Sequence, residues 1–219
     1  MVEVSTSILS VKKEDALATL YNLEVAKTDY FHIDVMDGKF VEQDTTLVMQ
    51  EYCNSIKQIS NLPLDVHLMV ENIKEYIDLF IPYEPNIITF HIEACRDKEE
   101  VLSLIKYIKE NGIKAGISIK PNTKIEEIFE YLPLVHLVLA MTVEPGYGGQ
   151  KLIPETIEKV KALKDYISKE NIEIDIEVDG GINLENKEDL KESGANILVV
   201  GSTIINSKDY KEVIEDLKE

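Results

Sequence analysis

Three apolar stretches of the chain end with side chains that can bind a metal or exchange a proton. The stretch HIDVMD contains His32 and, two positions later, Asp34; DVHLMV contains His67; and Asp179 closes IEVD. Residues two apart in a strand share a face, so His32 and Asp34 are expected to point the same way. Two imidazoles and two carboxylates form a mixed nitrogen and oxygen set that suits zinc, Fe(II), manganese or cobalt. The sequence therefore predicts a divalent metal site, provided that the fold brings these strand ends together.

Each of these side chains also has an ordinary structural interpretation. Histidines near strands are often buried core residues, and aspartates after strands often cap the next helix. Asp37 and Gly38 follow directly in the first stretch and are expected to make the turn that leaves the strand. The metal hypothesis thus depends on the elements that position the three segments.

Eight short apolar or β-branched runs predict eight strands. They span residues 2–9, 30–35, 63–70, 86–92, 114–119, 136–143, 174–179 and 196–201. Helical periodicity and capping residues mark several of the intervening segments, most clearly 96–112, 153–171, 183–194 and 209–219. The alternation predicts an α/β fold with one domain over residues 1–219, a (β/α)8 TIM barrel. An open doubly wound sheet is the alternative, which the absence of GxGxxG after the first run disfavours.

Glycine-containing loops follow the last three predicted strands. They are EPGYGGQ at 144–150, DGG at 179–181 and GST at 201–203. Glycines let backbone N–H groups approach an anion closely, and a helix beginning after Gly201 would add a favourable dipole. Loops after strands seven and eight are the usual phosphate site of a TIM barrel. We therefore predict that these loops bind a phosphate group.

Three methionines also fall at predicted strand ends: Met36, Met69 and Met141. Methionine commonly fills gaps in a core, and that interpretation is open for each of them. If all three face the barrel mouth, they form an apolar lining that keeps water away from a reactive carbanion.

The composition limits the classes of partner. The chain of 219 residues has a formal net charge of −18, which argues against nucleic acid or an anionic membrane as a partner. No signal-like segment or long apolar run is present, which predicts a cytoplasmic protein. Cys53 and Cys95 have no CxxC spacing, so thiol chemistry is not expected. An anionic substrate must then be bound by local donors.

Seven motifs, in order along nearly the whole chain, resemble the ribulose-phosphate 3-epimerase family. They are SILS (7–10), HIDVMDGKFV (32–41), DVHLMV (65–70), TFHIEA (89–94), MTVEPGYGGQ (141–150), EVDGGI (177–182) and VVGST (199–203). The resemblance implies a barrel of the ribulose-phosphate-binding type that interconverts D-ribulose 5-phosphate and D-xylulose 5-phosphate in the pentose phosphate pathway. It also implies a small-molecule sugar phosphate as partner and a homo-oligomer, either a dimer or a hexamer.

The resemblance further assigns roles to individual residues. It implies one divalent metal ion per subunit, bound by His32, Asp34, His67 and Asp179, with Asp34 and Asp179 also exchanging the proton. Ser7 and His67 would contact the sugar. The phosphate group would be bound by Gly146, Tyr147, Gly148, Gly149, Gly180, Gly181, Gly201 and Ser202. Met36, Met69 and Met141 match the methionine lining of the family.

Three departures from the family pattern leave alternatives open. EQ at 42–43 replaces the usual Pro-Asn, VKK at 11–13 replaces Ala-Asp-Phe, and Lys120 stands where asparagine is common. A 3-epimerase for another ketose phosphate, such as D-allulose 6-phosphate, would use the same chemistry on a longer sugar. A Schiff-base aldolase would use Lys120 as its nucleophile. A non-catalytic sugar-phosphate binder would need neither aspartate.

Overall fold

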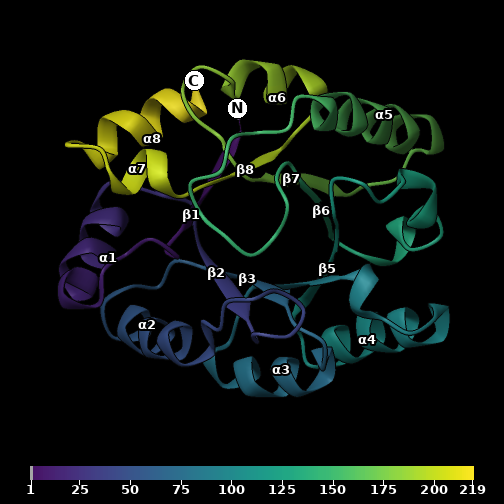
Figure 1. The fold of residues 1–219 in the computed structure, drawn as a ribbon, viewed down its shortest axis with the longest axis horizontal. Helices are drawn as coiled ribbons and strands as arrows, with labels where there is room; N and C mark the ends of the chain where they lie inside the picture. The colour runs from purple at the N-terminus through teal and green to yellow at the C-terminus, as the bar shows by residue number, and fades with distance from the viewer. Residues whose placement is uncertain (1) are drawn as a thin grey trace.

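Eight parallel strands form a closed barrel in chain order (Figure 1). The computed structural model describes residues 2–219. Each strand pairs with the next, and β1 pairs with β8, so the open-sheet alternative is wrong. The strands are β1 (Glu3–Ser7), β2 (Tyr30–Met36), β3 (Leu64–Met69), β4 (Ile87–His91), β5 (Lys114–Ile119), β6 (Leu137–Met141), β7 (Asp175–Asp179) and β8 (Ile197–Val200).

Helices form a ring outside the barrel (Figure 1). They are α1 (Ala16–Val25), α2 (Thr46–Ile59), α3 (Ile73–Phe80), α4 (Lys98–Glu110), α5 (Glu155–Glu170), α6 (Lys187–Ser193), α7 (Ser202–Ile205) and α8 (Tyr210–Lys218). The four helical segments expected from the sequence contain α4, α5, α6 and α8. Between β5 and β6 the connection instead contains two short 3₁₀ turns, Ile125–Glu127 and Leu132–Leu134. Over residues 2–219, no helix has both the length and the apolar composition needed to cross a membrane.

The strands are buried on both faces, which explains why they read as nearly continuous apolar runs. One apolar core lies between the strands and the outer helices. A second, smaller apolar cluster is formed by Ile87, Leu137, Leu139, Met141, Val143 and Ile197. By strand alternation this cluster shares the inward face of β4, β6 and β8 with Thr89 and His91, whereas β1, β2, β3 and β7 direct polar residues inward. The inward-facing residues of β1, β2, β3 and β7 are therefore mostly polar, and the predicted metal ligands lie on three of these strands.

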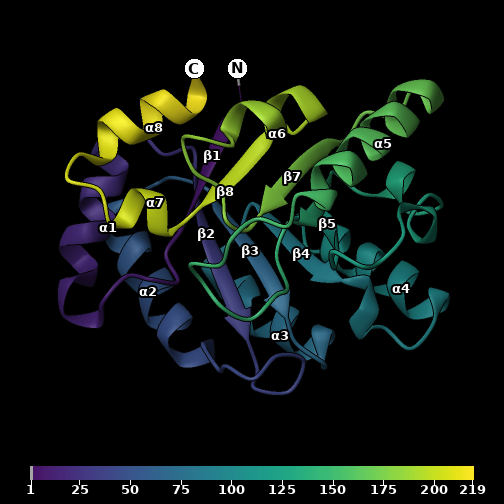
Figure 2. The same ribbon diagram turned by 45° about the horizontal axis from the view of Figure 1, so that its top comes forward.

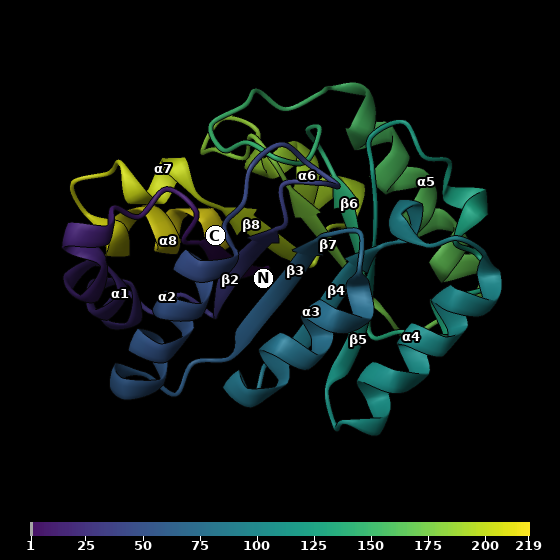
Figure 3. The same cartoon turned by 60° about the horizontal axis from the view of Figure 1, so that its bottom comes forward.

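The strand-to-helix loops gather at one end of the barrel, where the loops after β2 and β6 rise together (Figure 3). Strands β7 and β8 lie on the other side of the barrel from β2 and β3 (Figure 2). Asp37 makes the turn after β2, as predicted: its Oδ1 accepts hydrogen bonds from the backbone N–H groups of Lys39 and Phe40. Its Oδ2 accepts from the N–H of Glu71, 2.8 Å away, and so fixes this loop to the one after β3.

Candidate active site and metal centre

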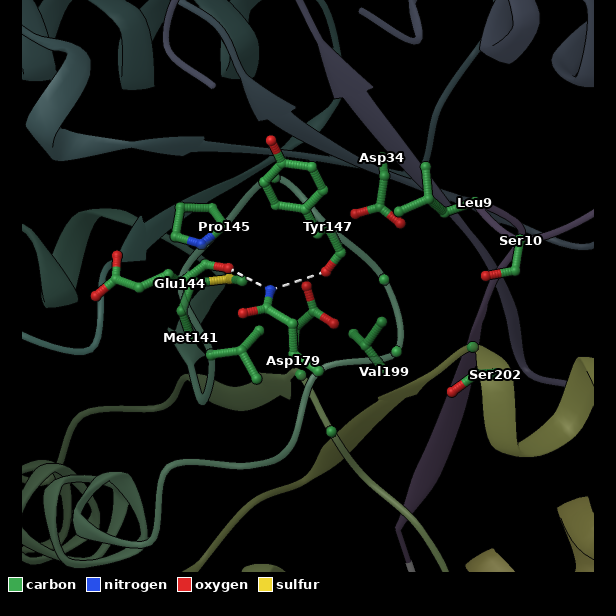
Figure 4. A pocket seen from close by; sticks show the side chains of 18 of the residues that line it. Leu9, Ser10, Asp34, Met141, Glu144, Pro145, Tyr147, Asp179, Val199 and Ser202 are labelled. Atoms are coloured by element: carbon green, nitrogen blue, oxygen red, sulfur yellow. Dashed lines mark hydrogen bonds between the residues drawn. The ribbon is translucent and has the colours of Figure 1, made fainter. Parts of the chain in front are cut away.

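The four predicted metal ligands lie together at the C-terminal ends of β2, β3 and β7. One donor atom from each of His32, Asp34, His67 and Asp179 lies within 4.8 Å of all the others. Asp34 Oδ1 is 3.4 Å from His32 Nε2 and 3.5 Å from His67 Nδ1, and Asp179 Oδ2 is 3.9 Å from His67 Nδ1. The carboxylates of Asp34 and Asp179 point into the same cavity from two sides (Figure 4).

The two histidines each leave one buried ring nitrogen without a hydrogen-bond partner. These atoms are His32 Nε2 and His67 Nδ1, both of which face the carboxylates. The other nitrogen of His32 is held by Asp65, whose Oδ2 lies 2.6 Å from Nδ1. Because a buried polar atom without a partner is costly, this arrangement suits a bound cation that accepts both lone pairs. The residues present therefore fit a divalent metal ion.

The environments of the two aspartates push their pKa values apart. Burial by itself would raise the pKa of Asp34, but contacts with His32 and His67 lower it well below its usual range. For Asp179, burial and the negative charge of Asp34 raise the pKa to about 7. Near neutral pH, Asp34 is therefore ionised while about half of the Asp179 side chains carry a proton, so the pair can supply both a base and an acid for chemistry on two faces of one carbon.

The raised pKa of Asp179 predicts the pH dependence of stability in metal-free protein. A raised pKa means that the fold favours the neutral acid, so its stabilising contribution is complete below the unfolded pKa, about 4, and is lost as the pH rises through about 7. Asp179→Asn keeps a neutral side chain at every pH. Between about pH 5.5 and pH 8, the free energy of unfolding of wild type should therefore fall relative to Asp179→Asn by on the order of 2 kcal/mol. Urea unfolding in the presence of a chelator measures this difference, and parallel curves for the two proteins would contradict the assignment.

Glycine loops form the outer wall of the cavity. Its lining includes all seven glycine and serine positions predicted to bind phosphate: Gly146, Gly148, Gly149, Gly180, Gly181, Gly201 and Ser202. Within residues 2–219, no protein acceptor meets the backbone N–H groups of Gly148, Gly149 or Gly181. Hydrogen bonds connect the loops: the hydroxyl of Thr142 donates to Gly180 O, and that of Thr203 donates to Ile182 O. The backbone donors are thus held in place and are free to bind an anion.

Gly181 has a conformation and a close contact that a larger residue cannot reproduce. Its φ is +69°, and an added Cβ would lie 2.9 Å from Gln150 O and still closer to the backbone N of Leu152. Gly181→Ala should therefore lower the free energy of unfolding by about 1 kcal/mol or more and raise the KM for a sugar phosphate. The matched control is Gly112→Ala, where φ is +76° but nothing lies within 4 Å of the added Cβ. Equal effects of the two substitutions on KM would show that backbone strain alone, and not the loop contact, is responsible.

The other predicted site residues line the cavity or contact one of the two aspartates. Met36, Met69 and Met141 line the cavity. The hydroxyl of Ser7 donates to Asp34 Oδ2 at 2.7 Å, so Ser7 holds the aspartate, and its contact with a sugar stays a prediction. Tyr147 lines the cavity but is about half exposed, and its hydroxyl donates to Glu42, one of the residues that depart from the family pattern. The loop after β6 is thereby attached to the loop after β2.

Lys120 does not point into the cavity. Its Nζ lies 4.1 Å from the centre of the Phe40 ring, which makes a cation–π contact. Its backbone N–H donates to Glu93, and its carbonyl accepts from Lys159 Nζ. This position gives no support to a Schiff-base role for Lys120.

Two buried groups beside the site were not predicted. Asp65 holds His32 and also accepts a hydrogen bond from Ser5 Oγ at 2.8 Å. Glu177 lies next to Asp65 and His32. Burial, together with the charge of Asp65, raises the pKa of Glu177 well above its usual range, so this acid is neutral. The signal was present in the sequence, since Asp65 and Glu177 stand two positions before His67 and Asp179 and so share their inward faces. The second missed group is His91 with Glu93, in the motif TFHIEA.

Comparisons with known proteins agree with the site. The model of the ribulose-phosphate 3 epimerase family matches residues 3–205. A ribulose-phosphate 3-epimerase from Helicobacter pylori is 40% identical over 218 residues, covering 99% of this chain and 97% of the relative. The Bacillus subtilis enzyme of the same name is 38% identical over 221 residues, covering 100% and 99% of the two chains. These relatives match along their whole length.

More distant similarity to solved structures supports the fold. The 3-hexulose-6-phosphate synthase of Salmonella typhimurium superposes with a TM-score of 0.67 at 18% identity, covering 98% of this chain and 96% of the other. KGPDC from Streptococcus mutans gives a TM-score of 0.73 at 8% identity, covering 100% and 96%. At such low identity these likenesses concern the barrel alone. The full-length sequence matches decide the family: the chain belongs to the ribulose-phosphate 3-epimerases, isomerases that act on carbohydrates.

Proposed function

We propose that this protein catalyses the metal-dependent epimerisation of D-ribulose 5-phosphate to D-xylulose 5-phosphate at C3. The observation that carries the proposal is the pair of carboxyl groups, Asp34 on β2 and Asp179 on β7, that face one cavity from two sides. Epimerisation beside a ketone requires removal of one C3 proton and delivery of another to the opposite face. Two acids on opposite sides of the carbon are the minimal apparatus for this exchange.

The two aspartates exchange roles between the two directions of the reaction. The ionised Asp34 removes the C3 proton of one epimer, and the protonated Asp179 delivers a proton to the other face. The reverse reaction begins with proton removal by Asp179. The separation of their pKa values supports a starting state in which Asp34 is ionised and Asp179 carries the proton.

His32, Asp34, His67 and Asp179 would bind one divalent ion: zinc, Fe(II), manganese or cobalt. The two unpartnered imidazole nitrogens beside two carboxylates support this donor set. Such an ion would act as a Lewis acid and would stabilise the negative charge that develops on the substrate during proton removal, a contribution of several kcal/mol. Asp65 fixes the orientation of the His32 ring, and Ser7 fixes that of the Asp34 carboxylate.

Backbone N–H groups of the glycine loops would bind the phosphate group. This supply of donors reconciles an anionic substrate with a net charge of −18, because no lysine or arginine is needed at the site. Met36, Met69 and Met141 would cover the reacting carbon and exclude water. Cytoplasmic location and assembly into a dimer or hexamer also stay predictions.

Incubation of the purified protein with D-ribulose 5-phosphate in deuterium oxide tests the proposal. We expect D-xylulose 5-phosphate to form and to carry deuterium at C3. Absence of exchange would instead identify a non-catalytic binder, and a borohydride-trapped adduct at Lys120 would identify an aldolase. The ratio of kcat/KM for D-ribulose 5-phosphate to that for D-allulose 6-phosphate distinguishes the pentulose from the hexulose substrate.

A further inference from the structure

A row of three buried or half-buried side chains runs outward from the proposed metal site. His67 Nε2 lies 3.0 Å from His91 Nε2, and His91 Nδ1 lies 3.1 Å from Glu93 Oε2. His91 ends β4, and Glu93 follows it in the next turn. Both histidine rings are completely buried, and Phe40 packs over His91 with ring centroids 5.0 Å apart. Three residues thus form a continuous hydrogen-bonded path that ends at a proposed metal ligand.

The outer end of this path is a fixed acceptor. Glu93 Oε1 accepts hydrogen bonds from the backbone N–H of Lys120, at 2.7 Å, and from the hydroxyl of Thr123. Burial by itself would raise the pKa of Glu93, but contacts with His91 and these donors lower it to about 2, so the group is a carboxylate. A carboxylate can only accept, so the facing nitrogen, His91 Nδ1, must carry a hydrogen.

The direction of the remaining hydrogen bonds follows from this assignment. His91 is completely buried against the ring of His67, and burial favours the uncharged form of an imidazole. A neutral imidazole has one donor nitrogen and one acceptor nitrogen, so His91 Nε2 accepts. His67 Nε2 must then donate to it, which leaves the lone pair of His67 on Nδ1. Nδ1 is the buried atom without a partner that faces Asp34 and Asp179.

We propose that His91 and Glu93 are positioning residues that select the tautomer of His67, so that its Nδ1 is free to bind the metal ion. The inference rests on the metal site proposed above. A histidine that binds a metal through one ring nitrogen commonly donates a hydrogen bond from the other nitrogen directly to a carboxylate. His32 is held in that direct way by Asp65. For His67 the carboxylate acts through an intervening histidine, so two residues outside the cavity control one ligand.

Glu93→Gln is expected to reverse the direction of hydrogen-bond donation along the path from Glu93 to His67. The amide oxygen can still accept from Lys120 N and Thr123 Oγ1, which places the amide NH₂ opposite His91 Nδ1. His91 must then accept at Nδ1 and donate from Nε2, and the hydrogen of His67 moves to Nδ1, where the metal should bind. We expect the dissociation constant for Zn²⁺ to rise by about 10- to 100-fold. Competition against a chromophoric chelator measures it.

The control variant is Glu126→Gln, which removes the same charge from an exposed position in the nearby turn Ile125–Glu127. It should bind Zn²⁺ as wild type does. Ring ¹⁵N shifts of metal-free protein provide a readout that does not depend on activity. Wild type should be protonated at His91 Nδ1 and His67 Nε2, whereas Glu93→Gln should show the opposite pattern. Because the wild-type spectrum is itself diagnostic, the inference can be tested even if the variant fails to fold.

Several outcomes would overturn the inference. Wild-type His67 protonated at Nδ1, or a doubly protonated His91, would contradict the assigned direction. Glu93→Gln with the ring shifts and Zn²⁺ affinity of Glu126→Gln would exclude a positioning role for Glu93. Failure of wild type to bind Zn²⁺ at all would instead overturn the proposed metal centre, and the inference with it.

Discussion

Asp34→Asn and Asp179→Asn should each lower kcat for epimerisation by about 10³-fold or more. A positioned acid or base contributes roughly 10²- to 10⁴-fold, and each aspartate is also a proposed ligand of the metal ion. Asparagine has a similar shape but cannot accept the C3 proton. Each single variant retains one acid, so it should exchange the C3 hydrogen with deuterium oxide from at most one of the two epimers. Turnover and one-sided exchange together assign an acid to each face of the carbon.

Asp175→Asn provides the matched control for these variants. Asp175 begins the same strand that Asp179 ends, and it is exposed at the opposite end of the barrel. The Asp175→Asn variant should turn over substrate at the wild-type rate, since this residue lies outside the cavity. Near-normal turnover by Asp34→Asn, or exchange from both epimers by either variant, would contradict the two-acid mechanism.

Removal of the proposed metal ion should lower kcat by a comparable factor. Dialysis against a chelator is expected to lower kcat by about 10²-fold or more, because Lewis-acid stabilisation of a developing oxyanion is worth several kcal/mol. Metal analysis of the untreated protein should find one ion per chain. Adding back zinc, Fe(II), manganese or cobalt singly should restore activity and identify which ions the site accepts.

The metal prediction has a clear contradictory result. Full activity in protein that metal analysis shows to be free of divalent ions would remove the metal from the mechanism. His67→Asn offers a second comparison, because it removes one proposed ligand while both aspartates remain. If no metal takes part, chelation should leave the same fraction of the starting activity in His67→Asn as it leaves in wild type.

Local sequence patterns were sufficient for the strands and for the positions of most proposed site residues. Alternation with a period of two placed His32 and Asp34 on one face, and β7 ends at Asp179 as expected. The predicted runs extend beyond some strands, as 2–9 does beyond β1, because buried loop residues such as Ile8 are as apolar as strand residues. The connection between β5 and β6 lacked a clear helical pattern, and it contains only 3₁₀ turns.

Contacts between distant segments could not be predicted in the same way. Glu93 acts on His91 because its own loop packs against the segment after β5, whose Lys120 N–H and Thr123 hydroxyl hold the carboxylate. Lys120 was a candidate nucleophile by its place at a strand end, yet its ammonium lies on the Phe40 ring. Tyr147 and Glu42 are 105 residues apart and meet across the barrel mouth. Side-chain direction in such loops depends on what packs opposite them.

The barrel, the donor types at its strand ends and the resemblance to an epimerase family could all be predicted from the sequence, because each depends on local periodicity and motif order. The three-dimensional contacts were needed to establish which nitrogen of each histidine faces the site and why Asp34 and Asp179 differ in pKa. Those properties arise from burial and from partners on other strands, such as Asp65 behind His32 and His91 behind His67. Strand register and barrel closure bring these partners within hydrogen-bond distance, and neither can be read from one segment alone.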